Sequence, residues 1–291
     1  MGLPALSSNY LKLLKRKRLF SPMLTSKFAR QVALAEPRGR LFCFPFAGGS
    51  AAVFAGWGAR MKPDVEVWTA LPRGRGMRFR ETPFKTVQAM VDEYFTALRA
   101  GLEAGTESGL DLPYAFYGHS LGGLMAFELT RRLQAEGLPM PERVFVGATA
   151  PPHLGLIHEA IHHLPDGEFV TAIQERYAGI PADVLNEPEL LEIFLPALKA
   201  DFAAYERYHF EETCPLGCGL TAFAGADDPG ITRELIGEWS RHTEGEFRLE
   251  AVDGDHFFLT RSAAIVQGAI GESLTPNRAA CNGALISSGV R

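Results

Sequence analysis

Residues 114–123 read Tyr-Ala-Phe-Tyr-Gly-His-Ser-Leu-Gly-Gly, an apolar run that passes through a G-x-S-x-G motif into a helical pattern. The apolar run predicts a buried strand, and the residues from Ser120 to about Ala135 predict a helix. The glycines permit a tight turn between these two elements, because larger side chains there would collide with the strand and the helix. We therefore expect the hydroxyl of Ser120 to be exposed at a sheet edge, near a helix N-terminus.

Further β-rich runs alternate with helical patterns along the chain, at residues 41–46, 66–71, 143–148, 220–224 and 247–252. Several of these runs are apolar throughout, as expected for strands that are covered on both faces. The alternation predicts an α/β fold with a mostly parallel central sheet flanked by helices. The interval between the strands at 143–148 and 220–224 reads as helices only, which predicts a helical lid over the C-terminal edge of the sheet.

A serine hydroxyl is a weak nucleophile and needs a base that a third group orients. The run 220–224 leads into Gly-Ala-Asp227-Asp228-Pro, and the run 247–252 leads into Asp-Gly-Asp-His256. The order serine, acid, histidine, with each residue on a loop after a strand, is that of the α/β-hydrolase fold. We assign His256 as the general base and Asp228 as the acid, because Asp228 directly precedes the Pro-Gly that leaves the loop. Asp227 is the alternative.

An oxyanion hole needs two converging backbone N–H groups. One should come from Leu121, directly after the nucleophile. The other should come from the loop Phe44-Pro-Phe-Ala-Gly-Gly-Ser50, where two glycines let the backbone approach the substrate closely. We expect the donor there to be Ala47 or Phe46.

Together these residues resemble the type II thioesterases that accompany polyketide synthases and non-ribosomal peptide synthetases. The resemblance spans residues 41–273 and rests on the motifs at 44–50, 118–123, 225–229 and 254–259, and on Leu195-Pro-Ala-Leu-Lys-Ala-Asp-Phe202. The last motif discriminates most, because general esterases lack it. The resemblance implies hydrolysis of acyl groups from the phosphopantetheine arm of acyl or peptidyl carrier proteins, either to remove aberrant or stalled chains or to release the product. It also implies a catalytic triad of Ser120, Asp228 and His256 and an oxyanion hole of Ala47 and Leu121.

Three residues in or beside these motifs are candidate substrate contacts: Phe46, His119 and Phe202. The place of His119 in the turn also fits a packing role. A basic run, formed by Arg73, Arg75, Arg78, Arg80 and Lys85, is equally consistent with a solvated face and with a surface that steers an acidic carrier protein.

The composition excludes several classes of protein. The chain of 291 residues is 46% hydrophobic, enough for a sizeable core, and has no apolar stretch long enough to span a membrane. Residues 1–30 contain seven basic residues and no acidic one, whereas the rest of the chain has 22 basic and 34 acidic residues. Such an acidic body is a poor nucleic-acid binder. We expect no cofactor, no metal, no nucleic-acid or membrane partner, a monomer, and a cytoplasmic location.

The predicted division of the chain follows from these patterns. Residues 1–38 form a basic, flexible extension, residues 39–274 the hydrolase domain with its lid at about 153–212, and residues 275–291 a disordered tail. Histidines 153, 158, 162 and 163 cluster near the lid, but we do not expect them to bind a metal, and we place His209 and His242 on the surface. Alternative functions on the same triad are a general carboxylester hydrolase and an acyltransferase. A non-catalytic docking subunit is disfavoured by the complete triad.

Overall fold

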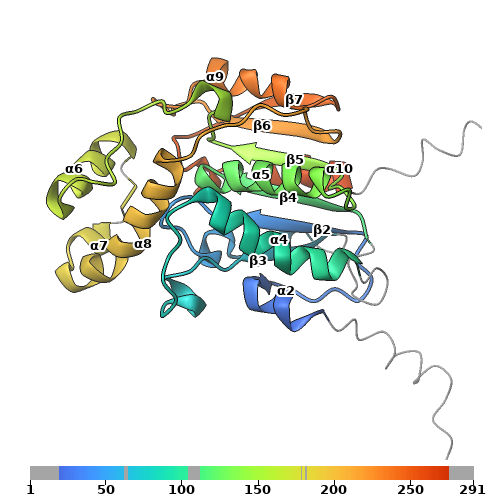
Figure 1. The fold of residues 1–291 in the computed structure, drawn as a ribbon, viewed down its shortest axis with the longest axis horizontal. Helices are drawn as coiled ribbons and strands as arrows, with labels where there is room; N and C mark the ends of the chain where they lie inside the picture. The colour runs from blue at the N-terminus through green and yellow to red at the C-terminus, as the bar shows by residue number, and fades with distance from the viewer. Residues whose placement is uncertain (1–19, 62–64, 104–111, 178, 181, 275–291) are drawn as a thin grey trace, which may run out of the picture.

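The computed structural model describes residues 20–61, 65–103, 112–177, 179–180 and 182–274. The tail expected at 275–291 and the first 19 residues of the expected extension lie outside the described residues. Within them, one mostly parallel sheet runs through the molecule with helices on both faces, and a separate group of helices lies at one end (Figure 1). The predicted α/β class and parallel sheet are confirmed.

The sheet has seven strands in the order β1-β3-β2-β4-β5-β6-β7. All neighbouring pairs are parallel except β1 and β3. The strands are β1 Phe28–Arg30, β2 Gly39–Phe44, β3 Val65–Ala70, β4 Tyr114–His119, β5 Arg143–Gly147, β6 Gly219–Gly225 and β7 Phe247–Val252. Because β2 to β7 run the same way, the loops that leave their C-terminal ends meet at one edge of the sheet.

Side chains alternate between the two faces of each strand and build a core on each side. On β2, Phe42 and Phe44 pack on one face, and Leu41 and Cys43 pack on the other. The first face is covered by α2 Pro22–Lys27, α4 Val87–Glu103, α5 Leu121–Ala135 and α9 Arg233–Gly237, and the second by α3 Trp57–Arg60 and α10 Ala263–Leu274. The predicted strand runs agree with the observed strands to within two residues, but the sequence patterns missed α10.

The group of helices beyond the sheet edge is the predicted lid. It consists of α6 Asp166–Tyr177, α7 Ala182–Leu185 and α8 Pro188–Glu206, all within the interval between β5 and β6. The arrowheads of β2 and β5 point toward these helices (Figure 1). A small core of its own, which includes Phe169 and Leu198, holds the lid helices together. Short one-turn helices occupy several loops: η1 Ala51–Phe54, η2 Gly76–Arg78, η4 Pro152–Leu154, η5 Glu238–His242 and η6 Phe258–Thr260.

The prediction that residues 1–38 form a flexible extension is wrong for residues 20–38. Ser21 caps α2 by accepting a hydrogen bond from the Leu24 N–H, and β1 pairs antiparallel with β3 at the edge of the sheet. Phe28 is 1% exposed and packs edge-on against Phe42. Burying an aromatic side chain of this size removes enough apolar surface from water to hold the segment against the body. The hydrolase body therefore begins before residue 39.

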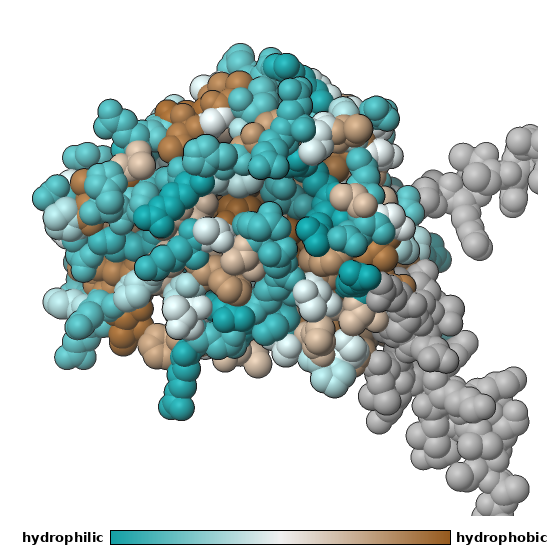
Figure 2. All heavy atoms as spheres, in the orientation of Figure 1, coloured by the Kyte–Doolittle hydropathy of each residue, from teal (hydrophilic) through white to brown (hydrophobic). Residues whose placement is uncertain are grey.

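Among the described residues, none of the helices combines the length and the apolar character that crossing a bilayer requires. Figure 2 shows a mainly hydrophilic face, on which hydrophobic residues form separate small groups.

Candidate active site

Ser120 occupies a strained turn between β4 and α5. Its backbone has φ 53° and ψ −120°, a region that non-glycine residues rarely adopt. A Cβ on Gly118 would lie 1.9 Å from the Gly122 carbonyl oxygen, and one on Gly122 would lie 2.1 Å from the Phe44 carbonyl oxygen. Only glycine fits at these two positions, as the motif predicted. The Ser120 N–H donates to the Gly147 carbonyl at 2.8 Å, which fixes the turn against β5.

The structure brings His256 and Asp228 to Ser120. The Ser120 hydroxyl lies 3.1 Å from Nε2 of His256, and Nδ1 of the same ring lies 2.7 Å from Oδ2 of Asp228. His256 follows β7 and Asp228 follows β6, so the parallel strands deliver all three side chains to one edge. Asp227 is exposed, whereas Asp228 is 7% exposed, so the geometry favours Asp228 as the acid.

The carboxylate of Asp228 is held in its charged form. Its second oxygen accepts hydrogen bonds from the backbone N–H groups of Gly230 and Ile231, both at 3.0 Å. Burial would raise the pKa of Asp228, but the hydrogen bond from His256 and those from the two backbone groups outweigh it and lower the pKa. A charged carboxylate fixes the proton of His256 on Nδ1 and leaves Nε2 free to accept the serine proton.

A pocket of about 640 Å³, counted with its open mouth, lies above Ser120 between the sheet edge and the lid. The side chains around it are mostly apolar, as in most small-molecule sites. Phe46 and Phe202, two of the three predicted substrate contacts, line it, and so do Ala47 and Leu121, the predicted oxyanion donors. From the lid, Tyr177 lies over His256 with the ring centroids 4.9 Å apart.

His119 does not line this pocket, so its assignment as a substrate contact is wrong. It is fully buried, because β4 directs its side chain toward Tyr117 and the His256 loop rather than toward the lid. Nε2 lies 2.7 Å from the His256 carbonyl oxygen and donates to it, and Nδ1 accepts from the Tyr117 hydroxyl at 3.0 Å. Burial, reinforced by the neighbouring His256, lowers the pKa of His119 to about 3, so the ring is neutral. His119 therefore holds the backbone of His256 in place.

Asp201 is a residue of the site that the sequence reasoning did not single out. It lies in α8, is 1% exposed, and accepts a hydrogen bond from the Gly48 N–H at 2.8 Å. Arg75 completes the cluster: it contacts Asp201 at 2.7 Å and donates to the Gly49 carbonyl at 2.6 Å. The lid helix is thereby fastened to the loop that carries Ala47. One sequence signal was available, since an acid within the apolar run 195–202 needs a buried partner.

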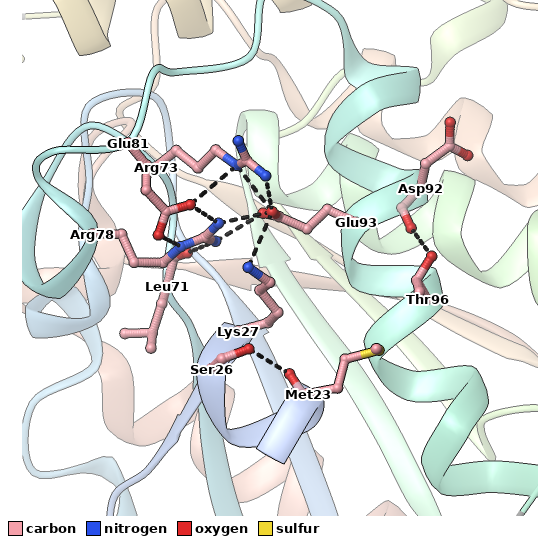
Figure 3. A network of polar contacts seen from close by, with 10 residues as sticks. All are labelled: Met23, Ser26, Lys27, Leu71, Arg73, Arg78, Glu81, Asp92, Glu93 and Thr96. Atoms are coloured by element: carbon pink, nitrogen blue, oxygen red, sulfur yellow. Dashed lines mark hydrogen bonds and ion pairs between the residues drawn. The ribbon is translucent and has the colours of Figure 1, made fainter. Parts of the chain in front are cut away.

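The interpretation of the basic run as a steering surface is wrong for three of its five members. Arg73 and Arg78 both bind Glu93 of α4, with Lys27 nearby (Figure 3), and Arg75 binds Asp201. Arg78 is only 5% exposed. Burial would raise the pKa of Glu93, but its hydrogen bonds with Arg78 and Arg73 lower it to about 2. These arginines hold the loop after β3 to the body, and only Arg80 and Lys85 of the run are exposed.

The remaining histidines have structural partners. His153 and His242 face each other with ring nitrogens 2.7 Å apart, and His162 binds Glu206. His209 is exposed, but His242 is 7% exposed, so its predicted surface position is wrong: the aromatic rings of Phe127 and Trp239 enclose it. Across the described part of the chain, no group of three or more His, Cys, Asp or Glu side chains is placed to hold a metal ion.

Comparison with known proteins agrees with this geometry. A family model described as a thioesterase domain matches residues 39–273. The linear gramicidin dehydrogenase LgrE of Brevibacillus parabrevis is 36% identical over 244 residues, which cover 83% of this chain and 86% of LgrE. Although LgrE is named a dehydrogenase, solved structures with a similar sequence and fold include several thioesterases.

Two of these structures are close in both sequence and fold. The thioesterase RedJ from the prodiginine biosynthetic pathway of Streptomyces coelicolor is 32% identical, with a TM-score of 0.74 over 84% of this chain and 95% of RedJ. The type II thioesterase BorB from the borrelidin biosynthetic cluster is 30% identical, with a TM-score of 0.75 over 86% of this chain and 98% of BorB.

Proposed function

The chain belongs to the thioesterase family, as one of its type II thioesterases, and from this premise we propose that Ser120, His256 and Asp228 release acyl groups from the phosphopantetheine arms of carrier proteins. The protein is a hydrolase that acts on thioester bonds, and its fold is the α/β-hydrolase fold.

The first half of the reaction transfers the acyl group to the enzyme. Nε2 of His256 takes the proton of the Ser120 hydroxyl while Oγ attacks the thioester carbonyl. The carbonyl oxygen becomes an oxyanion, which the N–H groups of Ala47 and Leu121 stabilise. When the C–S bond breaks, the pantetheine sulfur leaves with the proton from His256, and the acyl group stays as an ester on Ser120.

The second half of the reaction regenerates the free Ser120 hydroxyl. A water molecule gives a proton to Nε2 of His256 and attacks the acyl ester, and the same oxyanion forms and collapses. The proton passes to Ser120 Oγ, and the carboxylic acid leaves. The net reaction consumes one thioester and one water and yields one acid and one thiol.

The observation that carries the proposal is the pair of contacts on His256, 3.1 Å to Ser120 Oγ and 2.7 Å to Asp228, at the bottom of the lid pocket. A lid over such a pocket covers the bound acyl chain and shields the reaction from bulk water. Phe46 and Phe202 are the proposed contacts of the acyl group. The carrier-bound substrate is supported by the biosynthetic pathways in which RedJ and BorB are found.

The decisive experiment measures acyl release from a loaded carrier protein. The same acyl group is offered as the carrier thioester, the coenzyme A thioester and the p-nitrophenyl ester, with Ser120→Ala as the matched control. We expect release to be fastest from the carrier and to fall at least about 10⁴-fold in Ser120→Ala, in line with the loss of a triad nucleophile.

Other outcomes would assign the site differently. A preference for the p-nitrophenyl ester would make the protein a general carboxylester hydrolase. Transfer of the acyl group to an added amine or alcohol in preference to water would make it an acyltransferase. An unaltered rate in Ser120→Ala would remove the triad assignment.

A monomer and a cytoplasmic location are also part of the proposal. Among the described residues, the exposed large hydrophobic side chains are spread over several parts of the structure, and only Leu190 and Ile193 share a long helix, α8: Met23, Met77, Phe79, Leu154, Leu156, Leu190, Ile193 and Ile265. Cys43, Cys214 and Cys218 are free thiols, which suits a reducing compartment.

A further inference from the structure

A second hollow adjoins the active-site pocket. It encloses about 1000 Å³, counted with its open side, and its walls come from α5, the loop after β5, and the end of α8 with the residues that follow it. Apolar side chains line much of it, among them Leu124, Pro152, Leu156 and Phe210. We call this hollow the rear groove.

One side chain, Tyr205 of α8, lines both the active-site pocket and the rear groove. The other walls of the two hollows are also continuous along the chain. Thr149 lines the pocket and the next residue, Ala150, lines the groove. Leu121 lines the pocket, and Leu124, about one helical turn later on α5, lines the groove. The two hollows therefore lie back to back, with Tyr205 between them.

The backbone of α8 at this point is fixed, but the Tyr205 side chain is held only by packing. The neighbouring Glu206 accepts hydrogen bonds from the backbone N–H groups of Ile161 and His162, both at 2.9 Å. The Tyr205 hydroxyl, by contrast, has no hydrogen-bond partner among the residues that the structure describes. Replacing this side chain therefore breaks no polar contact and opens the wall without moving the helix.

The position of His256 decides which end of a substrate faces the groove. Because His256 gives its proton to the departing sulfur, the pantetheine side of the thioester lies against His256. None of the residues that line the rear groove comes from the loops that carry His256 and Asp228. The groove thus borders the pocket on a side that these loops do not form, where the tail of the acyl chain can enter, and its apolar walls suit methylene groups.

We propose that Tyr205 closes the acyl pocket and sets the longest acyl chain that the enzyme accepts, and that the rear groove is a latent site for the distal methylenes of longer chains. This inference rests on the proposed function, because it takes Ser120 as the acylated residue. Tyr205 acts on specificity and does not take part in the chemical steps.

The test compares butyryl and lauroyl thioesters of coenzyme A and follows the ratio of their kcat/KM values. In Tyr205→Ala the lauroyl-to-butyryl ratio should rise at least about tenfold, since each methylene that enters an apolar site is worth about a fourfold change. Tyr205→Phe keeps the ring and should keep the wild-type ratio. Tyr177→Ala removes a ring of the same size from the pocket wall over His256, which does not border the rear groove, and should not raise the ratio.

A double variant tests the groove itself. Leu156 is 41% exposed, so Leu156→Arg fills the groove with little effect on folding. In the Tyr205→Ala background it should return the ratio toward the wild-type value. Thermal unfolding of each variant shows that it is folded, and Tyr205→Leu provides the same comparison with a smaller truncation.

Several results would overturn the inference. An unchanged ratio in folded Tyr205→Ala, with Ser120-dependent butyryl release intact, contradicts it and leaves the proposed function standing. A variant that instead alters the preference between butyryl-coenzyme A and butyryl-N-acetylcysteamine would show that the groove receives the thiol side. Failure of the wild-type enzyme to release these acyl groups from a loaded carrier protein as well as from coenzyme A would overturn both proposals.

Discussion

The backbone N–H of Gly48 donates a hydrogen bond to the buried carboxylate of Asp201 at 2.8 Å, and so joins the loop beside Ser120 to the lid helix α8. Arg75 balances the charge of this carboxylate and binds the next carbonyl of the loop, that of Gly49. The position of the Ala47 N–H, the proposed oxyanion donor, therefore depends on a residue of the lid. If α8 moved away from the sheet edge, this loop would be displaced, and the oxyanion hole would lose the correct position of one donor.

This relationship predicts that Asp201→Asn lowers kcat about tenfold or more while KM changes less than about twofold. An oxyanion donor acts on charge that develops only in the transition state, so a displaced loop affects kcat rather than ground-state binding. Steady-state kinetics on a carrier or coenzyme A thioester measure both values. Asp166→Asn is the matched control, because it removes the same charge from an exposed partner of α8. Equal kcat values for Asp201→Asn and the wild type, with only the melting temperature lowered, would reduce Asp201 to a stabilising contact.

His119 should act as a positioning residue for His256. His119→Phe keeps a ring of similar size but loses the donor to the His256 carbonyl and the acceptor for Tyr117. We expect kcat to fall about tenfold, because a small displacement of the base weakens proton transfer. Burial keeps the pKa of His119 near 3, so the ring is neutral at any working pH. The pH–rate profile of the variant should therefore be lower than that of the wild type but have the same shape. A profile of different shape would mean that His119 itself exchanges a proton during turnover.

The Glu93 cluster makes a prediction about stability and pH. The pKa of Glu93 is lowered from 4.5 to about 2, so its stabilisation is complete above about pH 4.5 and is lost as the pH falls toward 2. Only 9% of the Glu93 side chain is exposed. Glu93→Gln should lower the free energy of unfolding by about 2–3 kcal/mol at pH 7, because Arg78, Arg73 and Lys27 would then face a neutral amide instead of a carboxylate.

Urea unfolding between pH 7 and pH 3 tests this prediction. The wild type should lose stability faster than Glu93→Gln below pH 4.5, so that the two curves converge. Asp92→Asn, at the adjacent and exposed position of α4, should follow the wild-type curve. Parallel curves for the wild type and Glu93→Gln would show that Glu93 does not contribute through its charge.

The sequence predicted those parts of the site that local rules determine. The positions of Ser120 and of the glycines beside it were predictable from a strand, a turn and a helix in direct succession. The order of Asp228 and His256 was predictable from the parallel sheet. The sequence did not reveal contacts that only the folded chain creates. Gly48 and Asp201 are 153 residues apart, and nothing in either motif indicates the other.

The errors have the same physical origin. We predicted residues 20–38 to be part of the flexible extension because β1 has only three residues. Its single core side chain, Phe28, is too little to produce a periodic pattern. We interpreted the basic run as a surface feature because nothing near it in the sequence indicated a partner. Its acidic partner, Glu93, lies 15 residues beyond Arg78, on the helix α4. Charge along the sequence does not show which side chains become paired.

The last prediction concerns the fit between the loop and the lid. Gly48 has φ +77°, and a Cβ there would lie 2.8 Å from both Leu198 and Phe194 of α8. Gly56 has nearly the same φ, +79°, but nothing within 4 Å of a Cβ. Gly56→Ala should therefore cost only the backbone strain, about 1 kcal/mol, and leave kcat unchanged. Gly48→Ala bears the same strain and must also displace the ends of the Leu198 and Phe194 side chains where the loop meets α8, so it should lower kcat at least about tenfold. Chemical unfolding and steady-state kinetics of the two variants separate the effects. Equal kcat values in Gly48→Ala and Gly56→Ala would mean that the lid accommodates the extra methyl group, and that the contact between α8 and the loop is not needed for the oxyanion hole.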